Sequence, residues 1–212
     1  MQESPQMTSY RQALKERIVV MAMGLFCRHG VKAVKMDDIA ACLGISKRTL
    51  YEIYENKEVL LLEGIKKNHH EREAELLRYA ETAANVIDII HYVYRQKTQE
   101  SQLISSAFYE DIQKYPHILQ FLEKLRKKNH EQFLAFMRRG VSEGFFRSDV
   151  NYQLISDMLD ALGDYMRQHR LYQQYSFEEL FRNILFVFLR GFCTLKGVEA
   201  FDKVCLPPSH QP

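Results

Sequence analysis

Helical periodicity with very few interruptions is the feature that most constrains this chain. From about Tyr10 to His29, apolar residues recur every three or four positions, and Gly30 follows as a suitable helix stop. Only 9 glycines and 5 prolines interrupt the 212 residues, and no segment of any length alternates between apolar and polar residues as a strand would. The same spacing predicts further helices near residues 83–98, 101–114, 116–140, 150–171 and 176–197. We therefore expect an all-α fold of about nine helices.

Composition and charge indicate a globular protein without a recognisable catalytic or metal-binding motif. Hydrophobic residues make up 46% of the chain and the formal net charge is +2, so a buried core is expected and a polyanionic partner does not follow from net charge alone. The 4 cysteines show no CxxC pair and no metal-ligand spacing, and we expect reduced thiols with Cys27 and Cys42 buried. The chain has no HExxH, GxSxG or phosphate-binding glycine loop. We expect no catalytic residues, no cofactor and no metal.

The sequence also shows no targeting or membrane-spanning segment. Its N-terminal residues lack the apolar stretch of a signal peptide. The most apolar run, residues 184–189, is far too short to cross a bilayer. We expect a soluble, cytoplasmic protein.

The stretch around Gly44 predicts two short helices joined by a tight turn. Gly44 supplies the positive φ that ends the first helix, and Ser46 is a suitable cap for the second. Such a pair is typical of a DNA-binding helix-turn-helix, whose second helix presents its N-terminal residues to the major groove. Any helical hairpin with a glycine turn has the same spacing, so a purely structural interpretation stays open. The three-helix N-terminal unit, the very short second helix and the basic start of the third favour DNA binding.

A continuous stretch of the N-terminal region also carries a family resemblance. Residues 30–65, GVKAVKMDDIAACLGISKRTLYEIYENKEVLLLEGI, resemble the DNA-binding domain of the TetR (tetracycline-repressor-like) transcriptional regulators. The matching positions are Gly30, Ile39 and Ala40, Gly44 to Ser46, Thr49 to Tyr51, Tyr54, and Lys57 with Glu58. We accordingly expect a helix-turn-helix domain over residues 10–56, an effector-binding and dimerisation domain over 57–200 that matches the family only in architecture, and a flexible tail over 201–212.

The resemblance implies roles for individual DNA-binding residues. Lys47, Arg48 and Thr49 would approach base edges or nearby phosphates, and Tyr51 would reach the backbone or a thymine methyl group. Tyr54 would stack at the junction between the two domains. Lys57 would hold a phosphate at the start of the fourth helix, with help from the helix N–H groups. The full predicted set is Lys35, Ser46, Lys47, Arg48, Thr49, Tyr51, Tyr54 and Lys57.

One position departs from the family pattern. Lys35 stands where Thr or Ser commonly caps the second helix, so the capping box with Asp38 would be lost, at a cost of about 1 kcal/mol. We hypothesise that Lys35 offsets this loss by contacting a phosphate directly. The alternative is a lysine that is simply solvated.

The last two long helices are expected to form a dimer interface. A short helix-turn-helix reads few base pairs, so specificity calls for two copies on a pseudo-palindromic operator. The C-terminal helix is apolar on more than one face and must therefore be buried on more than one face. The TetR resemblance likewise implies a homodimer formed by this helix pair. The predicted interface residues are Leu154, Met158, Leu162, Phe177, Phe181, Ile184, Leu185, Phe188 and Phe192.

The resemblance further implies a small-molecule effector bound in the C-terminal domain, and hence a ligand-responsive repressor. Aromatic, soft and imidazole side chains in the expected helices are candidates for the pocket: His91, Tyr92, Tyr94, Phe108, Tyr109, Phe133, Phe136, Met137, Tyr165 and His169. Each could equally be ordinary core or surface. A regulator whose C-terminal domain binds a protein partner, or no small molecule, is the alternative that remains open.

Overall fold

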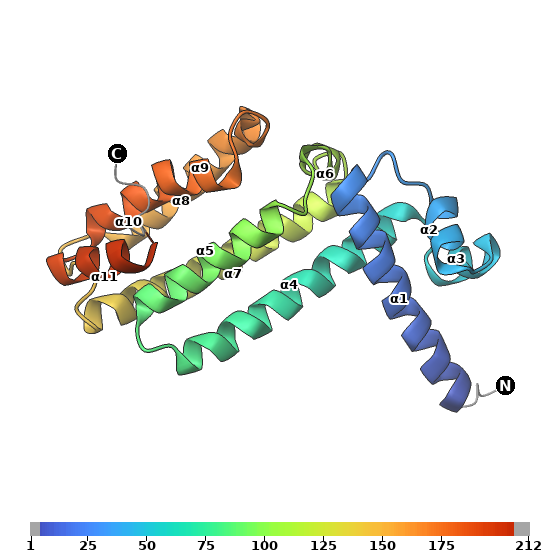
Figure 1. The fold of residues 1–212 in the computed structure, drawn as a ribbon, viewed down its shortest axis with the longest axis horizontal. Helices are drawn as coiled ribbons and strands as arrows, with labels where there is room; N and C mark the ends of the chain where they lie inside the picture. The colour runs from blue at the N-terminus through green and yellow to red at the C-terminus, as the bar shows by residue number, and fades with distance from the viewer. Residues whose placement is uncertain (1–4, 206–212) are drawn as a thin grey trace. The chain divides into compact units, whose positions relative to one another are not determined.

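The computed structural model describes residues 5–205 and is built from helices (Figure 1). These are α1 (Pro5–His29), α2 (Met36–Leu43), α3 (Lys47–Ile53), α4 (Lys57–Thr82), α5 (Val86–Ser101), α6 (Ser106–Ile112), α7 (Pro116–Ser142), α8 (Tyr152–Gln168), the 3-10 turn η1 (Leu171–Gln173), α9 (Phe177–Leu180), the π-helical turn η2 (Phe181–Leu185), α10 (Phe186–Phe192) and α11 (Leu195–Cys205). With α9, η2 and α10 counted as one continuous helix, the described residues form ten helices, one more than expected. Apart from one antiparallel bridge between Phe146 and Cys193, they contain no β-structure. The all-α prediction is confirmed, and none of the described helices is long and apolar enough to cross a bilayer.

Two compact units divide the chain. The first comprises the residues up to 75 together with 103–121, and the second comprises 76–102 and the residues from 122 on. The predicted helix-turn-helix domain, residues 10–56, lies within the first unit. That unit also holds α6 and the first part of α4, so it extends well beyond the predicted domain boundary.

In the first unit, α1 is the helix on which its neighbours pack. Ile18, Ala22 and Phe26 follow one another at four-residue spacing on one face of α1 and are fully buried. Helix α4 crosses α1 at Gly64, where a Cβ atom would come within 2.4 Å of Met23 Cγ and Sδ. Glycine at this position therefore leaves room for the Met23 side chain, which any larger residue would force to move.

Asp111 ties α6 to the turn that precedes α2. Its buried carboxylate accepts hydrogen bonds from Lys32 N–H at 2.7 Å and from Lys114 Nζ at 2.9 Å. Burial alone would raise the pKa of Asp111, but these hydrogen bonds lower it below its ordinary value. The start of α2 is thus positioned from a residue more than 70 positions away along the chain.

The second unit has an aromatic core. The rings of Phe146 and Phe192 meet edge to face at 5.5 Å, and those of Phe186 and Phe201 at 4.8 Å. Around them lie buried residues from α5, α7 and α11. Edge-to-face pairs of this kind add to the stabilisation that burial of the rings provides.

The predicted helix over residues 176–197 is interrupted in the structure. It ends at Phe192, and Cys193 is extended, with φ −75° and ψ 151°. Thr194 N–H donates to Phe145 O at 2.9 Å, and Thr194 Oγ1 accepts from Gly197 N–H at 3.1 Å, which caps α11. Backbone pairing with the turn after α7 replaces the helical hydrogen bonds here, so a separate helix follows.

This last helix corrects the prediction of a flexible tail from residue 201. Residues 201–205 form the end of α11, and the Phe201 side chain is fully buried. The remainder of the predicted tail, residues 206–212, lies outside the described residues. Helix boundaries elsewhere shift by a few residues: α5 begins at Val86 because Asn85 Oδ1 accepts from Ile87 N–H at 2.8 Å, and α8 ends at Gln168.

The structure buries a different pair of cysteines from the predicted one. Cys42 is exposed and Cys27 half-buried, so the expectation that both are buried was wrong. Cys193 and Cys205 are the buried pair, and burial raises their thiol pKa values to about 11 and about 12. Both thiols are therefore protonated at neutral pH.

Candidate nucleic-acid interface

Helices α2 and α3 form the predicted helix-turn-helix. Gly44 has φ 65°, and the N–H groups of Gly44 and Ile45 donate to Ala41 O and Ala40 O, both at 3.1 Å. This left-handed residue with its paired hydrogen bonds ends α2 and turns the chain. Ser46 then caps α3: its hydroxyl accepts from Thr49 N–H at 3.0 Å.

Burial decides which side of α3 faces outward. Leu50 is fully buried against α2, whose inner face consists of Ile39 and Ala40. The opposite side of α3 is exposed and begins with Lys47 and Arg48. The predicted presentation of these two residues at the surface is therefore what the structure has.

Both cations of this exposed face are held by carboxylates. Lys47 Nζ lies 2.9 Å from Asp37 Oδ2, and Arg48 Nε lies 2.8 Å from Glu52 Oε1. The hydrogen bond that Lys47 donates to Asp37 raises the pKa of Lys47, and the one that Arg48 donates to Glu52 raises the pKa of Arg48. The side chains are well exposed, Arg48 at 89%. These ion pairs are therefore weak, and each cation can readily exchange its carboxylate for another anion.

The remaining predicted residues of α3 differ in how available they are. Tyr51 is exposed, and its ring centroid lies 5.9 Å from Lys47 Nζ. Thr49 is half-buried, and its Oγ1 is hydrogen-bonded to Ser46 Oγ at 2.8 Å. Ser46 and Thr49 thus stabilise the first turn of α3, whereas the Tyr51 side chain is exposed at the surface.

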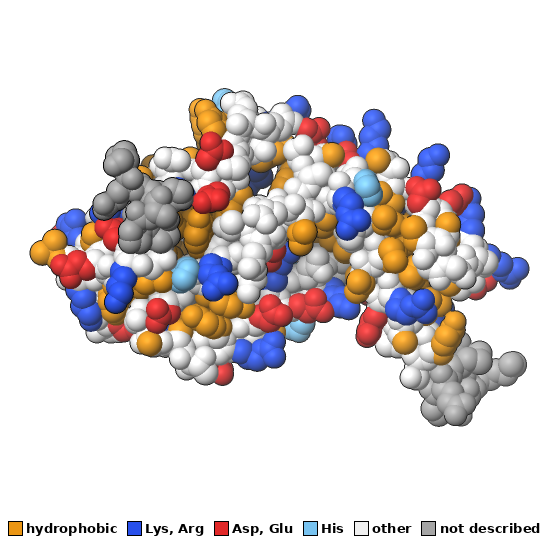
Figure 2. Space-filling model, viewed as in Figure 1, with side chains coloured by type: hydrophobic (Ala, Val, Ile, Leu, Met, Phe, Trp, Pro, Cys, Tyr) orange, Lys and Arg blue, Asp and Glu red, His pale blue; other side chains and the backbone are white. Residues whose placement is uncertain are grey.

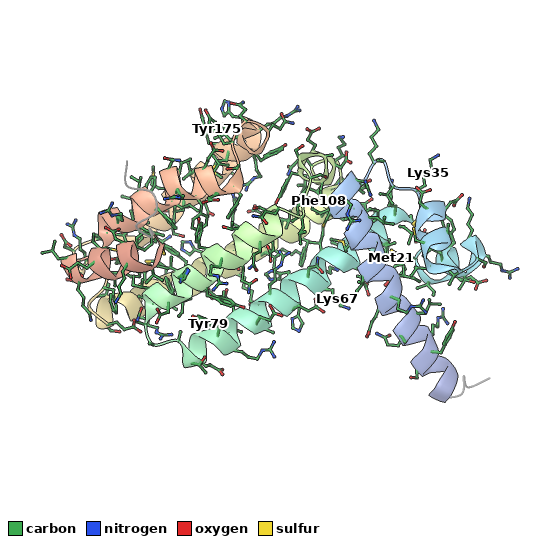
Figure 3. All side chains as sticks on the ribbon, viewed as in Figure 1. Met21, Lys35, Lys67, Tyr79, Phe108 and Tyr175 are labelled. Carbon is green, nitrogen blue, oxygen red and sulfur yellow. The ribbon has the colours of Figure 1, made fainter. Side chains whose placement is uncertain are left out.

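Lys35 lies at the start of α2 and is exposed (Figure 3). A lysine side chain cannot accept the hydrogen bond that a capping Thr or Ser would accept. The other half of the capping box survives, because Lys35 N–H donates to Asp38 Oδ2 at 2.8 Å. The expectation that the capping box is lost was therefore only half right. The exposed ammonium remains a candidate for a phosphate contact.

Lys57 is engaged inside the protein. Its Nζ donates to Val31 O at 2.8 Å and to Val34 O at 2.9 Å, in the turn between α1 and α2. Burial lowers the pKa of Lys57, which the charges of Asp111 and Asp38 partly oppose. The ammonium thus stabilises the turn that carries α2, and the phosphate contact expected of Lys57 stays a prediction.

Tyr54 is also a structural residue. It ends α3, its N–H donates to Leu50 O at 2.9 Å, and its side chain is only 3% exposed. Its hydroxyl has no hydrogen-bond partner among the described residues. Burial, together with the charge of Glu63, raises the pKa of Tyr54 to about 12. A ring buried in this way is not available for a direct contact with DNA; stacking at the junction between the two domains, the role expected of Tyr54, stays a prediction.

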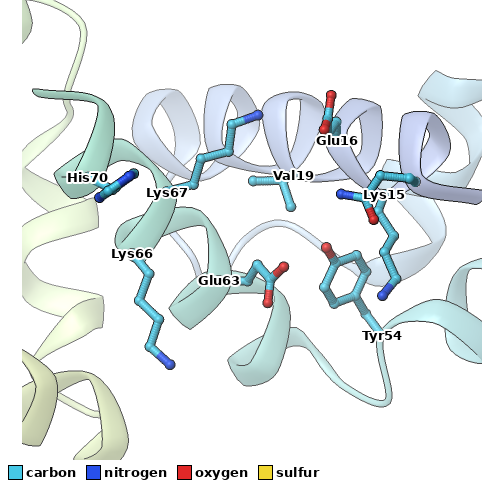
Figure 4. Close-up of a pocket in the computed structure, with 9 residues that line it drawn as sticks. Lys15, Glu16, Val19, Tyr54, Glu63, Lys66, Lys67 and His70 are labelled. Carbon is cyan, nitrogen blue, oxygen red and sulfur yellow. The ribbon is translucent and has the colours of Figure 1, made fainter. Parts of the chain in front are cut away.

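A cavity of about 350 Å³ adjoins Tyr54 in the first unit (Figure 4). Residues of α1 and α4 line it, among them Lys15 and Glu16 from α1 and Glu63 and Lys66 from α4. Its lining is strongly charged, with both signs present. None of the residues predicted for the effector pocket lines this cavity.

Asp37 and Glu52 are the residues of this surface that sequence reasoning missed. A signal for Glu52 was present, since it stands four residues after Arg48 and such pairs meet on a helix. No comparable signal exists for Asp37. It reaches Lys47 across ten residues only because the turn at Gly44 brings the starts of α2 and α3 together.

The residues predicted for the effector pocket belong to both units. Phe108 and Tyr109 belong to the first unit, and Tyr165 and His169 are exposed on α8 and just after it. The others lie in the second unit, half-buried or buried: His91, Tyr92, Tyr94, Phe133, Phe136 and Met137. Burial lowers the pKa of His91.

The predicted dimer residues divide between the core and the surface of the second unit. Phe192 is buried in the aromatic core, and Phe181 packs on Tyr94 with ring centroids 5.2 Å apart. These two side chains pack within a single protomer. In contrast, Leu154 and Met158 on α8 are 57% and 49% exposed. Leu162, Phe177, Ile184, Leu185 and Phe188 are half-buried.

Exposed apolar residues that were not predicted extend this surface. Tyr165, considered earlier only for the pocket, continues the α8 face of Leu154 and Met158 at helical spacing. Val187 on α10 is 63% exposed. No group of three or more potential metal ligands occurs among the described residues.

Comparison with known proteins finds a family model and several relatives similar to this chain. Residues 18–63 match the model described as "Bacterial regulatory proteins, tetR family". The uncharacterized HTH-type transcriptional regulator YezE of Bacillus subtilis (strain 168) is 22% identical over 159 residues, which cover 71% of this chain and 78% of that protein. The HTH-type transcriptional repressor KstR2 of Rhodococcus jostii (strain RHA1) is 24% identical over 155 residues, or 69% of this chain and 74% of that protein.

Solved structures share the fold at similarly low identity. A transcriptional regulator from Cytophaga hutchinsonii ATCC 33406 superposes with a TM-score of 0.68 and 19% identity, covering 84% of this chain and 98% of that one. A putative transcriptional regulator from Saccharomonospora viridis, solved in complex with choline, gives a TM-score of 0.61 and 21% identity over 74% of this chain and 93% of that one. The resemblance drawn from residues 30–65 is confirmed.

Proposed function

The chain is a relative of the TetR-family transcriptional regulators, and we propose that it is a ligand-responsive repressor that binds a pseudo-palindromic operator as a homodimer. In this proposal, residues 10–56 form the DNA-binding domain and the helices after Lys57 carry effector binding and dimerisation. The single observation that carries it is the exposed start of α3, with Lys47 and Arg48 at the surface of a tightly capped helix-turn-helix.

The DNA contacts divide into two kinds. Lys47, Arg48 and Tyr51 would enter the major groove, where an arginine or lysine can bond to guanine O6 and N7. Lys35, at the exposed start of α2, would contact a phosphate and fix the orientation of the domain. Tyr54 and Lys57 would hold α2 and α3 in position through contacts on the side that faces away from DNA.

The exposed apolar face of α8 supports a homodimer. Leu154, Met158 and Tyr165 are each about half exposed and share one side of the helix. A helix of a soluble protein that exposes such a row usually buries it against a partner. A second copy would also place two helix-turn-helix domains on one operator, which provides the specificity that binding in a genome requires.

A small-molecule effector is supported by analogy and by the second unit. The S. viridis regulator was solved with choline. In this chain, Tyr94 and His91 are half-buried polar side chains of α5. An effector that binds better to the state with low DNA affinity would release the operator by linkage.

One observation favours the alternative, in which the C-terminal domain binds a protein or no small molecule. The charged cavity lies between α1 and α4 in the first unit, and none of the predicted pocket residues lines it. A thermal-shift screen of small organic cations, acids and apolar compounds distinguishes the two. A ligand at a hundred times its Kd stabilises the fold by about 2.7 kcal/mol, whereas a domain without an effector site shows no shift.

Selection of bound duplexes from a random pool tests the DNA-binding proposal. We expect an inverted repeat with two half-sites, bound by two copies of the chain, and an affinity that falls steeply with salt. Loss of the selected complex on substitution of Arg48 by Ala, with an unchanged melting temperature, would locate the contact in α3. A pool that yields no enriched sequence would reject the proposal.

A further inference from the structure

The geometry of α2 and α3 points to Asp37 and Glu52 as specificity-determining residues. We propose that each carboxylate holds one cation of α3, the helix that would read the base sequence (the reading helix), and thereby weakens binding to DNA of unrelated sequence. This inference rests on the proposed DNA-binding function and concerns how the same surface discriminates between sequences.

The charges at the start of α3 balance one another. Lys47 and Arg48 are the only basic residues of α3, whose sequence is KRTLYEI. Asp37 Oδ2 lies 2.9 Å from Lys47 Nζ, and Glu52 Oε1 lies 2.8 Å from Arg48 Nε. Two positive and two negative groups thus form a neutral set, and Figure 2 shows acidic and basic side chains interleaved at this end of the molecule. The reading helix therefore offers little net attraction to a phosphate backbone.

Exchange of partners makes the carboxylates selective. At the correct operator, each cation leaves its carboxylate and bonds instead to acceptor atoms on a base edge. A bidentate contact to guanine is stronger than the exposed ion pair that is given up. On unrelated DNA, binding depends mainly on electrostatic contacts between cations and phosphates. There the carboxylate that remains behind faces the phosphates and is repelled by them.

Asp37 is well suited to this role because Lys47 is its hydrogen-bond and ion-pair partner among the described residues. The hydrogen bond to the N–H at the start of α2 comes from Asp38, not from Asp37. The Asp37 side chain is 55% exposed, and its bond to Lys47 joins the first turn of α2 to the first turn of α3. Asp37 therefore aims the Lys47 ammonium along the outer face of the helix-turn-helix.

The variants Asp37→Asn and Glu52→Gln remove each carboxylate while keeping its shape. Glu55→Gln is the matched control, because Glu55 is an exposed carboxylate just after α3 that pairs with neither Lys47 nor Arg48. It makes the same change in net charge. Melting curves followed by circular dichroism establish that all three variants fold.

Fluorescence anisotropy with a selected operator and with a random duplex, each over a salt series, gives the readout. We expect the Asp37 and Glu52 variants to bind the random duplex about two- to fivefold more tightly than the control does, the scale of one exposed ion pair. The salt dependence of log K should steepen by about 0.9 for each freed cation that reaches a phosphate. Operator affinity should change less, so the ratio of specific to random affinity falls.

A second measurement separates this mechanism from a general charge effect. In a Lys47→Gln background, Asp37→Asn should act no more strongly than Glu55→Gln, because the cation that it frees is absent. If Asp37→Asn and Glu52→Gln match the control on random DNA, the inference is overturned while the proposed function stands. If the wild-type protein binds no duplex, the proposed function fails and the inference fails with it.

Discussion

The variant Lys57→Met distinguishes a structural role for this lysine from a phosphate contact. Lys57 Nζ donates to Val31 O at 2.8 Å and to Val34 O at 2.9 Å. Methionine keeps an unbranched side chain of similar length but has no donor, so both carbonyls lose their partner. The turn between α1 and α2 would be weakened, and α2 and α3 with it.

The magnitude follows from the number and type of bonds lost. A hydrogen bond to a charged group contributes about 1.5–3 kcal/mol. Water can replace part of each bond because Lys57 is half-buried and not fully enclosed. We therefore expect the free energy of unfolding to fall by about 2–4 kcal/mol, which is less than the sum for two such bonds can reach.

Urea unfolding followed by circular dichroism measures this loss, with an unchanged m-value as evidence that the unfolded state is the same. Lys67→Met is the control, because Lys67 lies on the same helix and makes only an ion pair with Glu71 at 3.8 Å. Its effect should stay within about 0.5 kcal/mol. A Lys57→Met protein as stable as this control, but with a salt dependence of DNA binding lower by about 0.9 per subunit, would refute the structural role and restore the phosphate contact.

Three further predictions concern buried and exposed groups. Tyr54→Phe should leave stability unchanged or raise it by up to about 1–3 kcal/mol, because it removes a buried hydroxyl without a described partner; a lower melting temperature would show that the hydroxyl is bonded. Asp111→Asn should destabilise the protein at neutral pH. Because the pKa of Asp111 is lower in the folded state, the unfolded state binds the proton more readily. The stability that the Asp111 carboxylate contributes is therefore complete above the ordinary pKa of 3.8 and is lost as the pH falls through the lowered pKa of the folded protein. Urea unfolding over a pH series should show the stabilities of wild type and variant converging in acid. Met158→Glu should shift the protein towards monomers in sedimentation velocity at unchanged helicity, and a dimer as stable as wild type would exclude the α8 face as the interface.

The helix-turn-helix could be predicted from sequence because its determinants are local. The positive φ at Gly44, the cap at Ser46 and the inward position of Leu50 each depend on residues within one or two turns. The same holds for the start of α8 at Asn151, whose side chain accepts from the N–H groups of Gln153 and Leu154. Such signals survive in a single sequence, since the groups that satisfy one another are neighbours in the chain.

Side-chain partners that are distant in sequence could not be predicted. Lys57 was assigned to a phosphate because it begins a helix, yet its partners are carbonyls 23 and 26 residues earlier. Phe192 was assigned to a dimer, yet Phe146 covers it from the turn after α7. A helical pattern identifies an apolar face but does not say which surface covers it.

The amino-acid sequence by itself thus determined that the chain is all-α, that a helix-turn-helix lies near its start, and that Lys47 and Arg48 stand at the head of the reading helix. Periodicity and capping are properties of short segments, and they are written in adjacent residues. Only the tertiary structure decided that Asp37 meets Lys47, that Tyr54 and Lys57 face inward, and which apolar residues of α8 stay uncovered. Those outcomes depend on surfaces that the chain brings together from separate segments, and no local pattern encodes them.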